Sequence, residues 1–375
     1  MGALLAAMVA CLAAPASASD AAFFGALTRG RAELSMPGFR LGGAAQAPPI
    51  LEPAAAAIVG PLLSKTQASG AVVAFVSGGG IRVLGFGETA AGSGRAPDGD
   101  TVYQIGSLTK LFTGLALADM VGRGQVGLDD PIETLLPPGT RVPEFSGKKI
   151  TLRHLANHVS GLPRMPSNFN PADPLDPYAD YDAGLLYAFL ASHALASEPG
   201  AKAEYSNVGA GLLGHALAFK AGVSVDELLE RRVCAPLGMT DTFARLDASR
   251  QARLAPGYYL GQEVPPWTFS ALGGAGALRS TADDMSRFVS AQLGLSATPL
   301  ASAIAKTHQD ALFWQAAPIA GGFLLGHCGG TFGHQACLVL DTAASRGVIL
   351  LLNAGPLSAT DDSASQAALE LFGLP

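Results

Sequence analysis

Two groups of strand-forming segments, one near each end of the chain, constrain the fold most strongly. The segments are rich in β-branched, aromatic or other apolar residues, and the glycines at 78–80 separate the first two, as in a hairpin. The predicted strands are residues 71–77, 81–86, 323–326, 336–340 and 347–353. We therefore expect one mixed, mainly antiparallel sheet that is built from both chain ends and carries helices on its faces.

The middle of the chain has mostly helical patterns. The predicted helices, including one at each end of the folded part, are residues 55–67, 108–123, 152–159, 183–194, 208–220, 225–232 and 363–371. Repeated prolines between 161 and 182 predict a surface loop. The expected fold class is α+β, with one domain over residues 50–375 and a helical subdomain of about residues 111–260 inserted into it.

The composition excludes two classes of protein. Of the 375 residues, 49% are hydrophobic and 14% are charged, so the chain can bury a large core and is not intrinsically disordered. The formal net charge of −6 offers no basic footprint for a phosphate backbone, so we expect no nucleic-acid partner. Beyond the N-terminus, apolar runs fall far short of the roughly 20 residues of a membrane-spanning helix, so we expect no transmembrane segment in the mature chain.

The N-terminus has the pattern of a secretory leader. An uncharged apolar stretch, residues 3–14, precedes Pro15 and the small-residue site Ala16-Ser17-Ala18. We expect a signal peptide over residues 1–18, an N-terminal arm over 19–49, and a periplasmic or secreted protein. No lysine or arginine precedes Arg29, so the basic part of such a leader would lie upstream. The alternative is a lipoprotein acylated at Cys11.

The cysteines do not form a disulfide framework. Without Cys11, an odd set of Cys234, Cys328 and Cys337 is left. Cys328 and Cys337 flank a glycine-rich turn, and a hairpin could place them opposite each other for one cross-strand bridge. We expect two free, half-buried thiols instead.

A Ser-x-x-Lys pattern stands at the start of a predicted helix. Ser107 and Lys110 are three residues apart, which places them on one helix face with Cβ atoms about 5–6 Å apart. A desolvated lysine has a lowered pKa and can accept the proton of the hydroxyl, while the helix N-terminus favours negative charge. Taken alone, the pattern also fits a capping serine and a solvated lysine.

Two further elements are candidates for the same site. Tyr205-Ser206-Asn207 precedes a helix of small residues, and His327-Cys328-Gly329-Gly330 runs along a strand into a glycine turn, where a substrate backbone could approach closely. Each element alone also fits an ordinary turn or hairpin.

No metal or other cofactor is expected. Potential ligands fall close together at His327, Cys328, His334 and Cys337. Their spacing matches no zinc pattern. His154 and His158 have helical i, i+4 spacing but no adjacent glutamate, so they are expected to be core or capping residues.

Together, the three elements resemble the active site of the penicillin-recognising serine hydrolases, which include class C β-lactamases and D-alanyl-D-alanine peptidases. Further similar segments are residues 101–105, 128–131, 150–155, 158–163, 236–242 and 273–281. The resemblance extends from about residue 70 to 353. Residues 137–143, with Ile150 and Thr151, are most similar to the AmpH-type carboxypeptidase/endopeptidase branch.

The resemblance implies a role for each candidate residue. Ser107 would be the acylated nucleophile, and Lys110 would activate it. Tyr205 would shuttle the proton and later help water to attack, and Asn207 would orient the substrate amide. The backbone N–H groups of Ser107 and Gly330 would form the oxyanion hole.

The strand element departs from the best-known members, which have Lys-Thr-Gly where this chain has His327-Cys328-Gly329. His327, Gly329 and Gly330 would still line the substrate site. An ordinary histidine has a pKa near 6.5. The histidine at this position can therefore gain or lose its charge near neutral pH, whereas the lysine of the best-known members is permanently charged. If His327 meets a substrate carboxylate, acylation by a penicillin should strengthen as the pH falls through its pKa. Histidine also occurs here in D-aminopeptidase-like and esterase-like relatives.

The resulting functional prediction is an exported serine hydrolase that forms an acyl-enzyme on Ser107. The expected activity is that of a D-alanyl-D-alanine carboxypeptidase/endopeptidase, with a peptidoglycan stem peptide or a β-lactam as substrate. The alternatives are a class C-type β-lactamase, an esterase or D-amino-acid amidase, and a non-catalytic receptor for β-lactams or peptidoglycan. The sequence predicts no oligomeric state.

Overall fold

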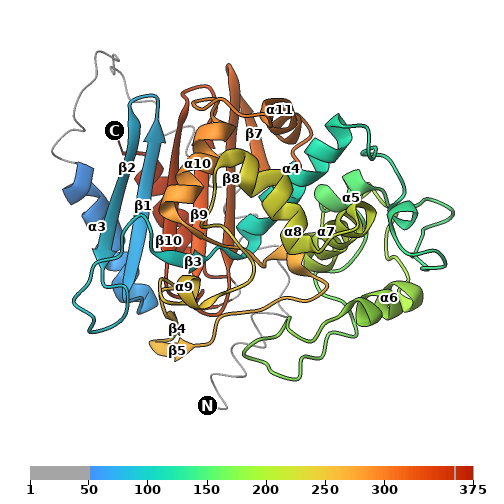
Figure 1. Cartoon of the computed structure of the whole chain (residues 1–375), viewed down its shortest axis with the longest axis horizontal. Coiled ribbons are helices and arrows are strands. Elements are labelled where there is room, and N and C mark those ends of the chain that lie inside the picture. Colours follow the sequence, from blue (N-terminus) through green and yellow to red (C-terminus); the bar gives the residue numbers. More distant parts are fainter. Residues whose placement is uncertain (1–50, 359, 375) are drawn as a thin grey trace.

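A six-stranded antiparallel sheet, to which both ends of the chain contribute, lies at the centre of the molecule (Figure 1). The computed structural model describes residues 51–358 and 360–374. In the order in which they pair, the strands are β2 (Gly80–Gly87), β1 (Gly70–Ser77), β10 (Arg346–Leu352), β9 (Gln335–Asp341), β8 (Gly322–Gly330) and β7 (Gln315–Ile319). The predicted fold class and the assembly of the sheet from both chain ends are confirmed.

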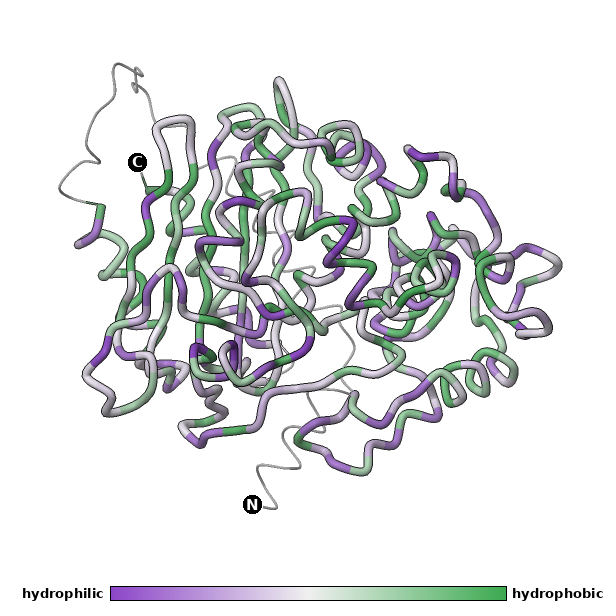
Figure 2. Tube along the Cα trace, in the orientation of Figure 1, coloured by the Kyte–Doolittle hydropathy of each residue, from purple (hydrophilic) through white to green (hydrophobic). Residues whose placement is uncertain are grey.

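The inner strands are apolar on both faces because helices cover both sides of the sheet. Almost every residue of β1 and β10 is buried, whereas the edge strand β2 is largely exposed. Helices α3 (Leu51–Thr66) and α12 (Ser363–Phe372) pack on one face, and α10 (Ala282–Gln292) packs on the other. Hydrophobic residues follow these strands and helices, and hydrophilic residues gather in the outer loops (Figure 2).

The remaining helices lie mainly beside the sheet, on the side of β7 and β8 (Figure 1). They are α4 (Thr109–Gly122), α5 (Leu152–Ala156), α6 (Ala183–Ser192), α7 (Asn207–Ala221), α8 (Val225–Leu229), α9 (Ala248–Gln251) and α11 (Ala301–Gln309). Asp182, Ser206 and Ser224 cap the N-termini of α6, α7 and α8 through their side-chain oxygens. Residues 161–182 contain no helix or strand, as their prolines predict.

Several short elements were not predicted. Two small sheets pair β3 (Val102–Gln104) with β6 (Arg279–Thr281) and β4 (Gly257–Tyr259) with β5 (Gln262–Val264). Helices α10 and α11 and strand β7 were also missed. The predicted helix 152–159 ends early, at Ala156, and His158 has a positive φ of 57° that no helix accommodates.

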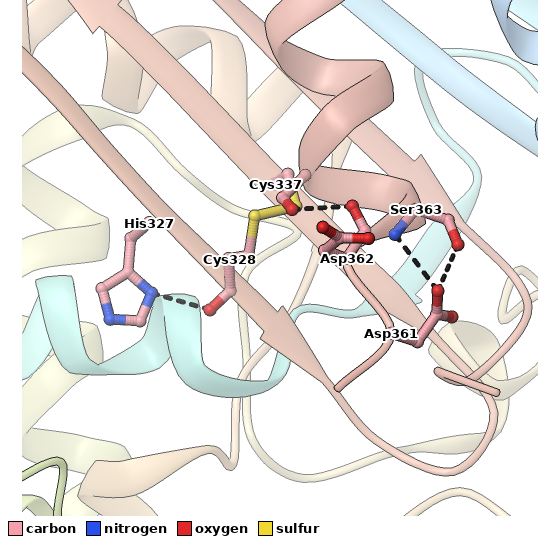
Figure 3. The surroundings of a disulfide bond; sticks show 7 residues. His327, Cys328, Cys337, Asp361, Asp362 and Ser363 are labelled. Atoms are coloured by element: carbon pink, nitrogen blue, oxygen red, sulfur yellow. Dashed lines mark hydrogen bonds between the residues drawn. A yellow bond between two sulfur atoms is a disulfide. The ribbon is translucent and has the colours of Figure 1, made fainter. Parts of the chain in front are cut away.

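Cys328 and Cys337 form a disulfide bond, so the prediction of two free thiols is wrong. The β8–β9 register places the two residues directly opposite each other, with Cα atoms 4.1 Å apart. Figure 3 shows the bond between β8 and β9, close to the start of α12. Cys234 is buried and is not part of a disulfide.

The predicted signal peptide and arm, residues 1–18 and 19–49, lie outside the described residues, as does Cys11. Within residues 51–358 and 360–374, no single helix has the length and apolar character needed to cross a membrane. Helix α7 and the segment Val225–Leu237 meet this criterion only when taken together, and the chain bends by 81° between them.

Candidate active site

Ser107 lies on a short 3-10 helix, Gly106–Leu108, that leads into α4 and packs against the end of β8. Two glycines make this approach possible. A Cβ atom on Gly329 would lie 2.5 Å from the backbone nitrogen of Ser107, and one on Gly106 would lie 2.6 Å from the backbone nitrogen of Gly330. Gly106 also has a positive φ of 47°. The backbone nitrogens of Ser107 and Gly330 therefore belong to two segments in close contact.

The Lys110 side chain is fully buried on the first turn of α4. Its Nζ atom lies 2.8 Å from Ser107 Oγ, 2.9 Å from Asn207 Oδ1 and 2.8 Å from the carbonyl oxygen of Ala275. Of these three partners, only the serine hydroxyl is able to donate a hydrogen bond. In this structure Nζ can donate to all three oxygens. If the amine loses a proton and keeps its bonds to the two carbonyl-type oxygens, its lone pair would point at the Ser107 hydroxyl.

Tyr205 lies just before α7, and its ring faces Lys110. The Nζ atom of Lys110 is 4.8 Å from the centroid of the Tyr205 ring. The ring of His158 packs against the Tyr205 ring with centroids 4.5 Å apart, and the Arg164 guanidinium lies 5.3 Å from the same ring centroid. The structure thus brings Ser107, Lys110 and Tyr205 together from segments about 100 residues apart.

Asn207 is the first residue of α7, and its side-chain amide links two parts of the site. Its Oδ1 atom accepts a hydrogen bond from Lys110, and its Nδ2 atom donates one to the hydroxyl of Tyr178 at 3.1 Å. Ser206 places it there by capping the helix, since Ser206 Oγ accepts the N–H of Gly209 at 2.8 Å. Asn207 therefore orients Lys110 in this structure.

A cleft opens beside Ser107. Its walls include the side chains of Tyr205 and Asn207 and the backbone of Gly329 and Gly330. Aromatic side chains that also line the cleft are Tyr178, Trp267, Phe269 and Phe332. The arrangement presents the Ser107 hydroxyl and a glycine-lined strand to a molecule in the cleft, while the Lys110 amine lies behind the serine and does not line the cleft.

Comparison with known proteins identifies the family. Residues 55–371, most of the chain, match the family described as Beta-lactamase. The chain belongs to the beta-lactamase family. This membership confirms the resemblance drawn from the sequence and indicates a serine hydrolase.

The relatives of this beta-lactamase family member include peptidases and β-lactamases. It is 34% identical over 222 residues to the D-alanyl-D-alanine-carboxypeptidase/endopeptidase AmpH of Escherichia coli K12. This alignment covers 59% of this chain and 57% of AmpH. It is 29% identical over 235 residues to a beta-lactamase of the same strain, and this alignment covers 62% of this chain and 59% of that protein. The chain thus spans somewhat more than half the length of these curated relatives.

A solved structure of similar fold is the β-lactamase/D-alanine carboxypeptidase from Yersinia pestis, complexed with citrate. The two structures align with a TM-score of 0.73 and 26% sequence identity over 86% of this chain and 99% of the other. A β-lactamase/D-alanine carboxypeptidase from Pseudomonas syringae aligns with a TM-score of 0.74 over 86% and 98% of the two chains, at 20% identity.

The His327 side chain of this protein does not carry a positive charge near neutral pH. Its ring is 1% exposed, and its Nδ1 atom lies 2.7 Å from the carbonyl oxygen of Cys328, so Nδ1 carries the hydrogen. Burial, followed by the charge of Lys110, lowers the pKa of His327 to about 3. The ring lies 6.4 Å from that of Tyr205, behind the residues that line the cleft. With its pKa lowered in this way, His327 is uncharged at neutral pH, and its titration moves below the range of an ordinary histidine.

His154 makes a capping contact, as predicted, and His158 bonds to the backbone beside Tyr205. His154 Nδ1 accepts the N–H of Thr151 in the capping box of α5, and His158 Nδ1 accepts the N–H of Ser206. The Nε2 atom of His334 lies 3.1 Å from the carbonyl oxygen of Ala255. Across the part of the chain that the structure describes, no group of three or more potential ligands could hold a metal ion.

Sequence reasoning missed four residues of the site. These are His158 and Arg164 beside Tyr205, Tyr178 beside Asn207, and Ala275, whose carbonyl oxygen faces Lys110. Arg164 and Tyr178 lie in the predicted proline-rich loop, and loops of this length often border sites. Nothing in the residue type of Ala275 could have revealed a contact made by its backbone.

Proposed function

We propose that this member of the beta-lactamase family is a D-alanyl-D-alanine carboxypeptidase/endopeptidase that forms an acyl-enzyme on Ser107. The observation that carries the proposal is the 2.8 Å separation between Lys110 Nζ and Ser107 Oγ, with two carbonyl-type oxygens holding the amine in place. The similarity to AmpH favours a cell-wall peptide as the substrate.

In the acylation step, Ser107 Oγ attacks the carbonyl carbon of the scissile amide while its proton passes to Lys110 Nζ. The carbonyl oxygen gains negative charge, and the backbone N–H groups of Ser107 and Gly330 stabilise that charge. Collapse of the tetrahedral intermediate breaks the C–N bond. The leaving nitrogen takes up the proton through the Tyr205 hydroxyl, and the serine ester remains.

Deacylation reverses the proton path. A water molecule attacks the ester carbonyl while its proton passes through the Tyr205 hydroxyl to Lys110, and the bond to Ser107 Oγ breaks as that oxygen takes up the same proton from Lys110. Gly329 and Gly330 would let the substrate backbone lie against β8. Asn207 would orient Lys110 in the free protein and could turn its amide to the substrate.

The proposal includes export to the periplasm or the exterior, where a cell-wall peptidase meets its substrate. Residues 1–18 would be the signal peptide and 19–49 the arm. Residues 50–375 would form the hydrolase domain, with residues of about 111–260 as its helical subdomain.

A class C-type β-lactamase is the second candidate, because beta-lactamases are also among the curated relatives. Both activities share acylation of Ser107 and differ in how fast water hydrolyses the acyl-enzyme formed from a β-lactam. Esterase or D-amino-acid amidase activity would use the same steps on other substrates, and a receptor would bind without turnover.

The deciding experiment is intact-mass spectrometry after mixing with benzylpenicillin, followed over time. We expect an adduct that decays slowly and maps to Ser107, together with release of D-alanine from a D-alanyl-D-alanine peptide. Ser107→Ala should abolish both, whereas Ser302→Ala, at an exposed position on α11, should retain both. Rapid loss of the adduct with opened drug would indicate a β-lactamase. No adduct and no turnover of any peptide or ester would indicate a receptor and refute the hydrolase.

A further inference from the structure

The β8 side of the cleft offers no charged group at the position where lysine occurs in the family pattern. His327 occupies that position, is buried, and donates its Nδ1 hydrogen to the carbonyl oxygen of Cys328. Its neighbour Cys328 is held in the disulfide on the other face of the strand (Figure 3). An anionic substrate would therefore need a cation from another segment.

Among the residues that the structure describes, the charged side chains that line the cleft are Arg164 and Asp361. Asp361 already has partners: its Oδ2 atom accepts the N–H of Leu357 at 2.9 Å, its Oδ1 atom accepts the N–H of Ser363 at 3.2 Å, and Lys65 lies 4.0 Å away. Its charge is thus compensated within the protein, and it does not compete for Arg164.

Arg164, in contrast, has a guanidinium without an anionic partner. Within residues 51–358 and 360–374, Arg164 takes part in no salt bridge of 4.0 Å or less, and no hydrogen bond satisfies its buried Nε atom. The Arg164 side chain is only partly buried, but its Nε atom is shielded from water, and a shielded donor without a partner is unfavourable unless something else pairs with it. The most direct explanation is a group that enters from the cleft.

The surroundings hold Arg164 next to the reacting groups. Its carbonyl oxygen accepts the N–H groups of Asn207 and Val208, at 2.9 and 3.2 Å, which ties its backbone to the start of α7. Its guanidinium lies over the Tyr205 ring at 5.3 Å. Stacking engages the flat face of a guanidinium and leaves its N–H edges available for a carboxylate.

We propose that the Arg164 guanidinium binds a carboxylate of the substrate, so that the hydrolase prefers anionic acyl donors to neutral ones of the same length. This inference rests on the proposed function, because it requires turnover at Ser107. The cation that selects the substrate would come from the proline-rich loop, on the α7 side of the cleft, and not from β8. The competing explanation is that Arg164 only orients Tyr205.

The test compares two aryl esters with the same leaving group, 4-nitrophenyl hydrogen adipate and 4-nitrophenyl hexanoate, which differ by a terminal carboxylate in place of a methyl group. We expect the wild-type protein to have the higher kcat/KM for the anionic ester, after subtraction of spontaneous hydrolysis. Arg164→Gln should lower the anionic-to-neutral ratio by about tenfold or more, as expected for loss of a charge-assisted hydrogen bond. Arg164→Lys should retain part of the preference, because it keeps the charge but not the fork geometry.

Two controls separate the possible failures. Arg82→Gln removes the same charge from an exposed position on β2, at the opposite end of the sheet order, and should leave the ratio unchanged. Raising the salt concentration should lower the wild-type ratio but not that of Arg164→Gln. An equal loss on both esters, or no change in the ratio, overturns the role of Arg164. If Ser107→Ala still hydrolyses both esters, the proposed function itself fails.

Discussion

The Nδ1 atom of His327 lies 2.7 Å from the carbonyl oxygen of Cys328. A carbonyl oxygen only accepts, so this contact assigns the ring hydrogen to Nδ1. Burial and the nearby Lys110 charge both oppose a second proton, and they lower the pKa of His327 to about 3. At neutral pH the site therefore contains an uncharged ring where the family pattern has a lysine.

His327 should therefore not contribute to the pH dependence of acylation between about pH 5.5 and 8, the range that brackets the pKa of an ordinary histidine. His327→Asn retains an N–H donor near the Nδ1 position and has no titratable group. Rates of acylation by benzylpenicillin in the two proteins should therefore change in parallel with pH. A rise at low pH in the wild type that the variant lacks would show that the imidazole becomes charged and meets the substrate.

Buried histidines should make the fold sensitive to acid. The pKa of His327 is lowered to about 3 and those of His308 and His334 to about 4, in each case mainly by burial. Below the ordinary pKa of about 6.5 the unfolded chain takes up protons that the folded chain cannot, so stability falls as the pH falls from about 6.5 towards 4. Each residue should cost about 2 kcal/mol at pH 5.

Chemical denaturation at pH 7.5 and at pH 5 measures this effect. His308→Gln should reduce the difference between the two unfolding free energies, because it removes one of the groups that must stay neutral. Equal stability at the two pH values would contradict the prediction.

Removing the buried amine should eliminate acylation without emptying its site. Lys110→Met fills a similar volume but leaves Ser107 without a proton acceptor, so kcat/KM should fall by about three to four orders of magnitude. Single-turnover acylation by benzylpenicillin measures the step directly. Lys220→Met, at an exposed position on α7, provides the matched control and should acylate normally. Substantial activity in Lys110→Met would assign the proton transfer to another group.

The disulfide between Cys328 and Cys337 should stabilise the end of the sheet that contacts Ser107. The bond joins residues 9 apart in sequence, and closure of a loop of this length corresponds to about 2.5 kcal/mol. Cys328→Ser combined with Cys337→Ser should lower the free energy of unfolding by about that amount. Alkylation of the denatured protein, counted by mass with and without prior reduction, tests the bond itself. If both cysteines are alkylated without reduction, they are free thiols.

The sequence predicted the parts of the fold that have strong local signals. The runs in β1 and β10 are continuously apolar, and the glycines at 78–80 allow the tight turn between β1 and β2. Strands β3 and β6 have three residues each, too few for a periodic pattern, and tertiary pairing alone defines them. The predicted strand at 323–326 extends to Gly330, because pairing with β9 compensates for the poor strand propensity of two glycines.

The site also has a part that local sequence signals predict and a part that depends on tertiary contacts. Ser107 and Lys110 are one helical turn apart, so local geometry alone predicts their contact. The charge state of His327 depends on burial by segments that are distant in sequence, and local patterns carry no information on such burial. The disulfide was misjudged for a similar reason, since only the exact pairing of β8 and β9 decides whether the two sulfur atoms meet.

His158 should act as a positioning residue for Tyr205. Its ring lies 4.5 Å from the Tyr205 ring, and its Nδ1 atom accepts the N–H of Ser206 at 3.1 Å, so it supports both the tyrosine and the residue after it. The positive φ of 57° at His158 directs the imidazole to this place after α5 has ended. Displacement of a catalytic group by about 1 Å can cost up to a hundredfold in rate.

Two substitutions separate the two contacts of His158. Asparagine tolerates a positive φ and can accept the Ser206 N–H, but it has no ring, so His158→Asn should lower kcat by about tenfold or more and change KM less. Phenylalanine keeps the ring and loses the acceptor, so His158→Phe should mainly reduce stability, by about 1–3 kcal/mol. His193→Ala removes a histidine that packs on Phe189, outside the cleft, and should leave kcat unchanged. A folded His158→Asn protein with wild-type kcat would mean that Tyr205 is held by its other neighbours, and that the stacked imidazole contributes only to packing.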